Sequence, residues 1–193
     1  AEAKRLGMSN THFENATGLP APTHKASARD LATLARAIIR DSADYYPIYA
    51  EREFKYNGIK QGNRNALLYT DPSVDGLKTG HTEEAGYCLV TSSKRNDMRL
   101  ISVILNTASA QARADQTRTL LGWGFSTFEK VTPLQANTVL ANAKISFGKV
   151  ETVDAALGAP WHLTVPRGQQ VQTAIEIQPG LEAPVAQGPV IGK

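Results

Sequence analysis

Three consecutive strand-like runs between residues 74 and 105 constrain the fold of this chain more than any other feature. The runs Val74–Gly80, Ala85–Ser92 and Met98–Leu105 are separated by short turns, the second at Arg95-Asn96-Asp97. The second and third runs are almost continuously apolar, a pattern typical of strands that are buried on both faces. The sequence therefore predicts an antiparallel sheet that is covered by helices.

Two amphipathic segments flank these runs and are predicted to form the covering helices. Residues 27–41 begin with Ser27 as an N-cap and with Asp30 in the position of a capping box. A core-facing stripe at helical spacing follows, made of Leu31, Leu34, Ala35, Ile38 and Ile39. Residues 109–129 form the second predicted helix, with Leu120, Leu121, Trp123, Phe125 and Phe128 as its expected packing side.

Two shorter signals complete the reading of the first two thirds of the chain. Asn57-Gly58 lies between the strand-like runs Glu53–Tyr56 and Ile59–Gln61, which predicts a tight β-hairpin. Ala1–Gly7 has basic residues near its end and a glycine after them, a pattern typical of the last turns of a helix. We therefore expect that helix to begin in a segment that precedes Ala1.

The character of the sequence changes near Val131-Thr132-Pro133. Beyond this point helical periodicity is absent, and short β-prone runs are separated by prolines and glycines. The predicted strands span residues 137–147, 161–165, 170–177 and 183–191. The sequence thus predicts a first domain over residues 1–131 of α+β class, and a small all-β sandwich domain over residues 132–193 that is truncated at its C-terminal end.

Composition and charge exclude several classes of protein. Of the 193 residues 41% are hydrophobic and 20% are charged, as in ordinary soluble domains. The net charge of +3 is spread over alternating basic and acidic residues, so nucleic-acid binding is not expected. The single cysteine, Cys88, excludes an intrachain disulfide and a zinc site built on paired cysteines, and it is expected to be a small buried apolar residue. The histidines lack metal-ligand spacing.

The tripeptide Lys78-Thr79-Gly80 ends the first of the three strands and carries the clearest chemical signal. The K-T-G motif accompanies S-x-x-K and S-D-N in β-lactamases and penicillin-binding proteins. A lysine beside a nucleophilic serine favours proton transfer and stabilises a developing oxyanion. A threonine hydroxyl can bind a substrate carboxylate, and Gly80 leaves room for a peptide to lie along the strand edge.

The motif extends into a longer run that resembles one family. Residues Val74 to Thr82, followed by Ala85-Gly86-Tyr87, closely resemble the low-molecular-mass D-alanyl-D-alanine carboxypeptidases, which are penicillin-binding proteins. The resemblance covers nearly the whole chain. It includes Asn15-Ala16-Thr17-Gly18-Leu19, Ser27-Ala28-Arg29-Asp30, Asn63-Arg64-Asn65, Met98-Arg99-Leu100-Ile101-Ser102, Leu120-Leu121-Gly122-Trp123-Gly124-Phe125 and Val165-Pro166-Arg167-Gly168.

This resemblance implies roles for individual residues. Lys78 matches the ammonium group that lies beside the serine of the S-x-N motif. Thr79 matches a ligand of the terminal carboxylate of the substrate, and the backbone N–H of His81 matches one of the two oxyanion-hole donors. Arg113 matches an arginine that faces the same carboxylate from the helix after the third strand. Arg64 is a further candidate for this pocket, although its loop is one residue short of the family pattern.

The resemblance also implies that the nucleophile lies outside this sequence. In the family, S-x-x-K and S-x-N precede the segment that Ala1–Gly7 matches. Ser146-Phe147-Gly148-Lys149 spells S-x-x-K, but it lies in the predicted β domain, where Ser and Lys do not share a helix face. We therefore expect that this chain alone is inactive and that the missing N-terminal segment of the same protein completes the site.

The complete enzyme is expected to remove the terminal D-alanine from peptidoglycan stem peptides through an acyl-enzyme. β-Lactams are expected to acylate the same serine, and no metal or organic cofactor is implied. The family works in the periplasm, at the inner membrane, through a C-terminal anchor that this sequence does not include. The implied fold is the C-terminal part of a penicillin-binding-protein or β-lactamase-like transpeptidase domain, followed by the β-sandwich.

Two alternative functions remain open from the sequence. A class A β-lactamase also uses K-T-G, but it lacks an additional β domain like the one expected after residue 131. A non-catalytic fragment or binding module is the second alternative, and the absence of a nucleophile motif is the observation in its favour.

Overall fold

The computed structural model describes residues 1–186, 188 and 190–192, and it divides into two compact units. The first unit spans Ala1–Ser126, and the second begins at Thr127. The boundary expected from the sequence, between residues 131 and 132, falls inside the first strand of the second unit, β6 (Phe128–Leu134).

The first unit is built on a three-stranded antiparallel sheet in the order β3-β4-β5. Its strands are β3 (Val74–Thr82), β4 (Gly86–Arg95) and β5 (Met98–Thr107). Asn96 and Asp97 connect β4 to β5 with φ angles of 46° and 62°, in the left-handed region that asparagine and aspartate tolerate. The predicted strands and the turn between the last two are thus confirmed, with each strand longer than expected.

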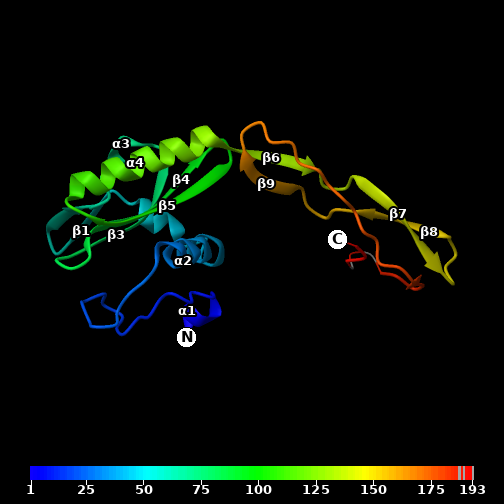
Figure 1. Cartoon of the computed structure of the whole chain (residues 1–193), viewed down its shortest axis with the longest axis horizontal. Helices are drawn as coiled ribbons and strands as arrows, with labels where there is room; N and C mark the ends of the chain where they lie inside the picture. The colour runs from blue at the N-terminus through cyan, green and yellow to red at the C-terminus, as the bar shows by residue number, and fades with distance from the viewer. Residues whose placement is uncertain (187, 189, 193) are drawn as a thin grey trace. The chain divides into compact units, whose positions relative to one another are not determined.

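Helices cover this sheet, as predicted (Figure 1). The helix α2 (Ala28–Asp41) contacts β4 and β5, and α4 (Ala110–Thr127) follows β5 and packs on the opposite face. The core beneath α4 combines side chains from β3, β4, α4 and the short helix α3 (Leu67–Thr70). Its members are Leu67, Leu68, Val74, Leu89, Ala114 and Leu121, with Leu100 and Phe125 packed against them.

The packing side of α4 differs in part from the expected one. Leu121 is buried and Phe125 packs on the core, but Leu120 and Trp123 are 39% and 56% exposed. The buried positions of α4 follow helical spacing through Ala114, Thr117, Leu121 and Gly124, which leaves residues 120 and 123 on the outer side. Phe128 belongs to β6 and not to the helix.

The N-cap of α2 is confirmed, whereas its capping box has a different partner. The Ser27 side chain accepts a hydrogen bond from the Asp30 backbone N–H at 3.2 Å. The Asp30 carboxylate is buried and binds the preceding loop, where it accepts from the Asn10 N–H and from the Thr11 hydroxyl at 2.9 and 2.7 Å. Asp30 therefore joins the loop to the first turn of α2.

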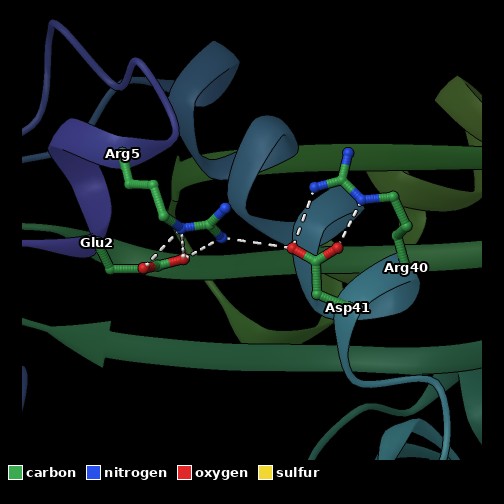
Figure 2. Close-up of polar contacts among 4 residues, drawn as sticks. All are labelled: Glu2, Arg5, Arg40 and Asp41. Atoms are coloured by element: carbon green, nitrogen blue, oxygen red, sulfur yellow. Dashed lines mark hydrogen bonds and ion pairs between the residues drawn. The ribbon is translucent and has the colours of Figure 1, made fainter.

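The opposite end of α2 is joined to the N-terminal segment by charged side chains. Arg5, in α1 (Glu2–Arg5), binds Glu2 in its own helix and reaches Asp41 at 3.3 Å (Figure 2). Asp41 also binds Arg40, and the hydrogen bond from Arg40 is the main reason that the pKa of this carboxyl is lowered. All four side chains are substantially exposed, so this network stabilises the fold only modestly.

Between α2 and β3 the chain forms a short 3-10 helix and a hairpin. The 3-10 helix η1 (Tyr46–Ala50) precedes β1 (Glu53–Tyr56) and β2 (Ile59–Gly62). Asn57 and Gly58 connect the two strands with φ angles of 47° and 76°, as in the turn that Asn-Gly favours. The predicted hairpin is therefore confirmed.

The second unit contains two small sheets and, in its described residues, no helix. In one sheet β6 pairs with β9 (Trp161–Pro166), and in the other β7 (Val139–Ser146) lies between β8 (Thr152–Ala156) and β10 (Leu181–Glu182). Strands were expected at 137–147 and 161–165 and are confirmed. β6 and β8 were not expected.

Two predicted strands in the second unit are wrong over the residues that the structure describes. The run 170–177 is irregular apart from an isolated bridge between Ile177 and Gly192. The run 183–191 shows no strand at its described positions, and Gln187 and Pro189 in it, like Lys193 after it, lie outside the described residues. Among the described residues neither run forms a paired ladder, and β-propensity alone does not reveal whether a run has a partner strand.

The fold class expected from the sequence is nevertheless confirmed, because an α+β unit is followed by an all-β unit. In the part of the chain that the structure describes, no helix has both the length and the apolar character that a membrane span requires.

Candidate active site

The motif Lys78-Thr79-Gly80 lies on an open edge of the sheet. In the described chain β3 pairs only with β4, so its second edge has no neighbouring strand. Lys78, Gly80 and His81 are exposed there, and Thr79 is half-buried. An open strand edge presents unpaired backbone N–H and C=O groups, which can bind an extended peptide.

The pairing with β4 determines which face of the sheet each motif residue occupies. Thr79 is opposite Leu89, and His81 is opposite Tyr87. Because Leu89 belongs to the core beneath α4, and side chains alternate along a strand, Thr79 and His81 lie on the α4 face. Lys78 and Gly80 lie on the opposite face.

The Lys78 ammonium group has no carboxylate partner in the described part of the chain. Its Nζ donates a hydrogen bond to the backbone carbonyl of Thr79, within the motif itself. None of the ion pairs among the described residues includes Lys78. Its positive charge therefore remains available to an anion or to a developing negative charge at the strand edge.

Arg113 is the buried cation of the site. It lies in the first half of α4, is only 6% exposed, and donates to the carbonyl of Gly80 at 3.3 Å and to the carbonyl of Arg64 at 3.2 Å. Its guanidinium carbon also lies 5.7 Å from the centre of the Tyr87 ring. Arg113 thus connects the motif strand to the loop before α3. No hydrogen bond between Arg113 and Thr79 occurs in the described structure.

Tyr87 is a member of this cluster that sequence reasoning did not single out. Its ring lies between the two predicted site residues, with its centre 3.9 Å from that of His81. The cross-strand pairing of His81 with Tyr87 explains the contact. The sequence signal was the position of Tyr87, which follows the motif across a short turn.

Arg64 contributes its backbone to the site, while its side chain is exposed. The neighbouring Asn65 is 1% exposed, and its side-chain amide donates to the carbonyl of Gly76 in β3 at 3.3 Å. The Asn65 side-chain oxygen accepts from the N–H of Leu67 at the start of α3. The loop that carries Arg64 is therefore bound directly to the motif strand through Asn65, and indirectly through Arg113.

Cys88, expected to be a small buried apolar residue, and Ser146, rejected as a nucleophile from the sequence, are two other side chains with nucleophilic atoms. Cys88 is opposite Gly80 and is half-buried, which is more exposed than expected, and its thiol donates to the carbonyl of Ala85 at 3.2 Å. Ser146 ends strand β7 and is exposed. Because Ser146 and Lys149 are not on a helix, the S-x-x-K spelling there lacks the geometry of the motif.

Together these contacts form a site suited to anionic groups. An open strand edge lies between an exposed lysine and a buried arginine, and the described residues contain no group of three or more metal-ligating side chains. A carbonyl that gains negative charge, or a carboxylate, would be stabilised in such a place.

Two family models match the chain over most of its length. Residues 1–109 match the model described as D-alanyl-D-alanine carboxypeptidase, and residues 128–193 match the model described as penicillin-binding protein 5, C-terminal domain. The first match contains the motif strand and Arg64, and ends shortly before Arg113.

Individual relatives agree with the family models. The chain is 41% identical to the D-alanyl-D-alanine carboxypeptidase DacC of Escherichia coli K12, across 98% of this chain and 48% of DacC. It is 40% identical to DacA of the same organism, across 97% of this chain and 47% of DacA. The chain thus spans about half the length of the curated relatives it matches.

A solved structure shows the same fold. The crystal structure of penicillin binding protein 5 from Haemophilus influenzae superposes with a TM-score of 0.84 at 39% identity, over 99% of this chain and 57% of that chain. The predicted resemblance is confirmed by these comparisons.

Proposed function

Because the chain belongs to the D-alanyl-D-alanine carboxypeptidase family, we propose that it forms part of a serine-type enzyme that removes the terminal D-alanine from peptidoglycan stem pentapeptides. The observation that supports this most directly is the K-T-G motif on the open edge of β3, with the buried Arg113 bound to the carbonyl of Gly80. A peptide that lies along this edge would present its C-terminal end to the cations of the site.

Each residue of the motif strand has its own role in binding or catalysis. Lys78 supplies a positive charge beside the attacking serine and the developing oxyanion. The backbone N–H of His81 is one donor of the oxyanion hole. Thr79 binds the C-terminal carboxylate through its hydroxyl, and Gly80 keeps the strand edge clear for the peptide backbone.

Two arginines complete the carboxylate pocket. Two of the five N–H donors of Arg113 are directed at backbone carbonyls, so the guanidinium retains donors for a carboxylate on the α4 face. The exposed Arg64 adds positive charge at the same end of the strand. A free carboxylate is the feature that distinguishes the C-terminal residue of a stem peptide from an internal one.

The serine nucleophile is contributed by a segment that precedes Ala1 in the longer protein. The chain covers only about half of the length of DacC and DacA, and Ser146, which begins the sequence S-x-x-K, ends a strand and does not lie on a helix. The serine attacks the carbonyl carbon of the D-alanyl-D-alanine amide, and D-alanine leaves with a proton on its nitrogen. Water then hydrolyses the ester, and a β-lactam acylates the same serine.

This chemistry requires no metal or organic cofactor. Its substrate is peptidoglycan, and its site of action is the periplasmic face of the inner membrane, where an anchor outside residues 1–193 would hold the protein. The relatives named as penicillin-binding proteins support this placement.

The proposal is tested with the full-length protein that contains this chain. Fluorescent penicillin labelling and release of D-alanine from a stem pentapeptide are measured for wild type and Lys78→Ala. Loss of the charge is expected to slow acylation by both compounds by roughly 10²–10³-fold, the usual cost of one preorganised group. The Cys88→Ser variant is the matched control on the neighbouring strand and should act at the wild-type rate. Wild-type protein that neither reacts with penicillin nor releases D-alanine would contradict the proposal.

A further inference from the structure

The motif strand contains an irregularity three residues before Lys78. Val74 is opposite Ser93 and Gly76 is opposite Ser92, so two steps along β3 correspond to one step along β4. Asp75 is therefore an extra residue in β3, as in a β-bulge. Bulges change the direction in which the following side chains point.

This bulge decides the faces of the catalytic motif. Val74 packs in the core beneath α4, whereas Gly76 faces Tyr46 on the other side of the sheet. In a regular strand two residues this far apart would share a face, because the side-chain period is two. Without the extra residue, Lys78 would point to the α4 face and Thr79 to the opposite face.

The carboxylate of Asp75 is held by two side chains from different elements. Arg99, in β5, binds both carboxylate oxygens, with Nη1–Oδ1 at 2.8 Å and Nη2–Oδ2 at 2.7 Å. The Tyr46 hydroxyl, from η1, donates to Oδ1 at 3.1 Å. Arg99 also binds the hydroxyl of Ser92, which is opposite Gly76. The Arg99 side chain thus crosses β4 to reach the bulge.

Tyr46 also restricts the backbone next to the bulge. Its side chain is buried, and a Cβ placed on Gly76 would lie 2.6 Å from its hydroxyl oxygen. The hydroxyl therefore occupies the space that any other residue at position 76 would need. The guanidinium of Arg99 lies 5.4 Å from the centre of the same ring, which packs the three groups together.

We propose that Asp75, Arg99 and Tyr46 are positioning residues that fix the bulge and thereby place Lys78 and Thr79 on their catalytic faces. The inference rests on the proposed function, because it assigns these residues a task in acylation. A bidentate ion pair with an additional hydroxyl donor fixes the carboxylate in direction as well as in distance. Loss of either partner would allow the bulge to move along β3, and the motif would shift with it.

A second ion pair at the same end of β3 provides a matched control. Arg95 binds Asp71 at 2.8 Å and the Ser73 hydroxyl at 3.0 Å, and it stacks on Phe125. Both carboxylates thus pair with an arginine of the β4–β5 hairpin, but Asp71 and Ser73 lie before the bulge. Breaking either ion pair would remove its contribution to the stability of the fold. Only breaking the pair at Asp75 would also change the register of the motif.

The test uses the full-length protein and rapid labelling with fluorescent penicillin. The acylation rate constant and the final fraction of labelled protein are measured for Asp75→Asn, Arg99→Gln and Tyr46→Phe, with Arg95→Gln as the control. A destabilised protein would show a smaller labelled fraction at an unchanged rate constant. Misplaced catalytic groups would show a full labelled fraction at a reduced rate constant.

We expect Asp75→Asn and Arg99→Gln to label completely but up to about 100-fold more slowly, the scale that follows from displacement of a catalytic group by about 1 Å. Arg99→Lys should restore part of the rate, and Arg95→Gln should retain it. Tyr46→Phe removes a single hydroxyl and gives the same test if Arg99→Gln does not fold. Wild-type rates in the Asp75 and Tyr46 variants, or an equal loss in Arg95→Gln, would overturn the inference. A wild-type protein that is not labelled would instead contradict the proposed function.

Discussion

Arg113 combines a full positive charge with nearly complete burial, which is costly unless the charge is compensated. Here two backbone carbonyls and the face of Tyr87 provide the compensation. Carbonyl dipoles and an aromatic ring offset a charge only in part, so the site favours the arrival of an anion. A substrate carboxylate would complete the coordination of the guanidinium.

From this residue a first prediction follows for substrate discrimination. In the full-length protein, Arg113→Ala should lower kcat/KM for a peptide ending in D-Ala–D-Ala by about 1.5–3 kcal/mol, the usual range for a hydrogen bond to a charged group. A substrate whose carboxylate is amidated should lose much less. The measurement compares wild type and mutant on the free-acid and the amidated peptide. An equal loss of kcat/KM on the two peptides would show that Arg113 only holds Gly80 and Arg64 in place and does not bind the carboxylate.

Tyr46 is the residue whose ionisation reports on the bulge. The pKa of the Tyr46 phenol is raised from the ordinary value of 10.0 to about 12, mainly by burial and in smaller part by the neighbouring Asp75 carboxylate. Since the folded protein disfavours the phenolate, the contribution of Tyr46 to stability is complete below pH 10 and is lost as the pH rises toward 12.

The corresponding prediction concerns unfolding at alkaline pH. The free energy of unfolding should fall more steeply between pH 10 and pH 12 in wild type than in Tyr46→Phe, which has no hydroxyl to ionise. Denaturant titrations at several pH values measure this difference. Parallel curves for the two proteins would show that Tyr46 ionises as freely in the folded state as in the unfolded state.

At the scale of secondary structure, local sequence signals were sufficient to predict the elements that depend only on their own residues. Asn57-Gly58 selects a hairpin, and Ser27 begins a helix, because each acts through the backbone next to it. β8 was missed and the run 170–177 was overpredicted, because a strand also needs a partner. The bulge at Asp75 was not predictable for the same reason, since it is defined by the register of β3 against β4.

The site likewise combines features that can be read from local sequence with contacts that only the fold reveals. The K-T-G motif is legible in the linear sequence, so Lys78 and Thr79 could be proposed without a structure. The bonds from Arg113 to Gly80 and Arg64 join three separate parts of the chain, and only the fold shows that they meet. Resemblance to a family singled out Arg113, whereas the contacts of Tyr87 and Asp75 depend on the sheet register and were not predicted.

The first turn of α2 gives a prediction at this scale. Asp30→Ala would remove the buried carboxylate that accepts hydrogen bonds from Asn10 and Thr11, and the loss of these two bonds should cost about 1–3 kcal/mol of stability. Ser27→Ala should cost less, about 1 kcal/mol, because it removes only the cap. Denaturant unfolding measures both variants, and Ser27→Asp, which retains a capping oxygen, serves as the control. A smaller loss for Asp30→Ala than for Ser27→Ala would show that the loop contributes nothing to the stability of α2.

At the scale of the whole molecule, the two units have different relations to the proposed reaction. Every residue with a proposed catalytic or binding role lies in Ala1–Ser126, on β3, on α4 or on the loop that precedes α3. The second unit contributes none of them, although its match to the C-terminal domain of penicillin-binding protein 5 covers residues 128–193. The proposed acylation therefore requires only one addition to the first unit, namely the segment that carries the serine.

The last prediction tests this requirement on the molecule as a whole. Residues 1–193 alone should form no covalent adduct with a fluorescent penicillin, because Lys78 and the N–H of His81 can assist a serine but cannot replace it. The full-length protein should be labelled, and its Ser146→Ala variant should be labelled at the wild-type rate, since Ser146 lies at the end of a strand and has no lysine one helical turn away. Gel fluorescence after denaturation measures all three proteins. If residues 1–193 were labelled and the label were lost in their Ser146→Ala variant, the nucleophile would lie in the second unit. That result would contradict the proposal that the serine lies in a segment outside residues 1–193.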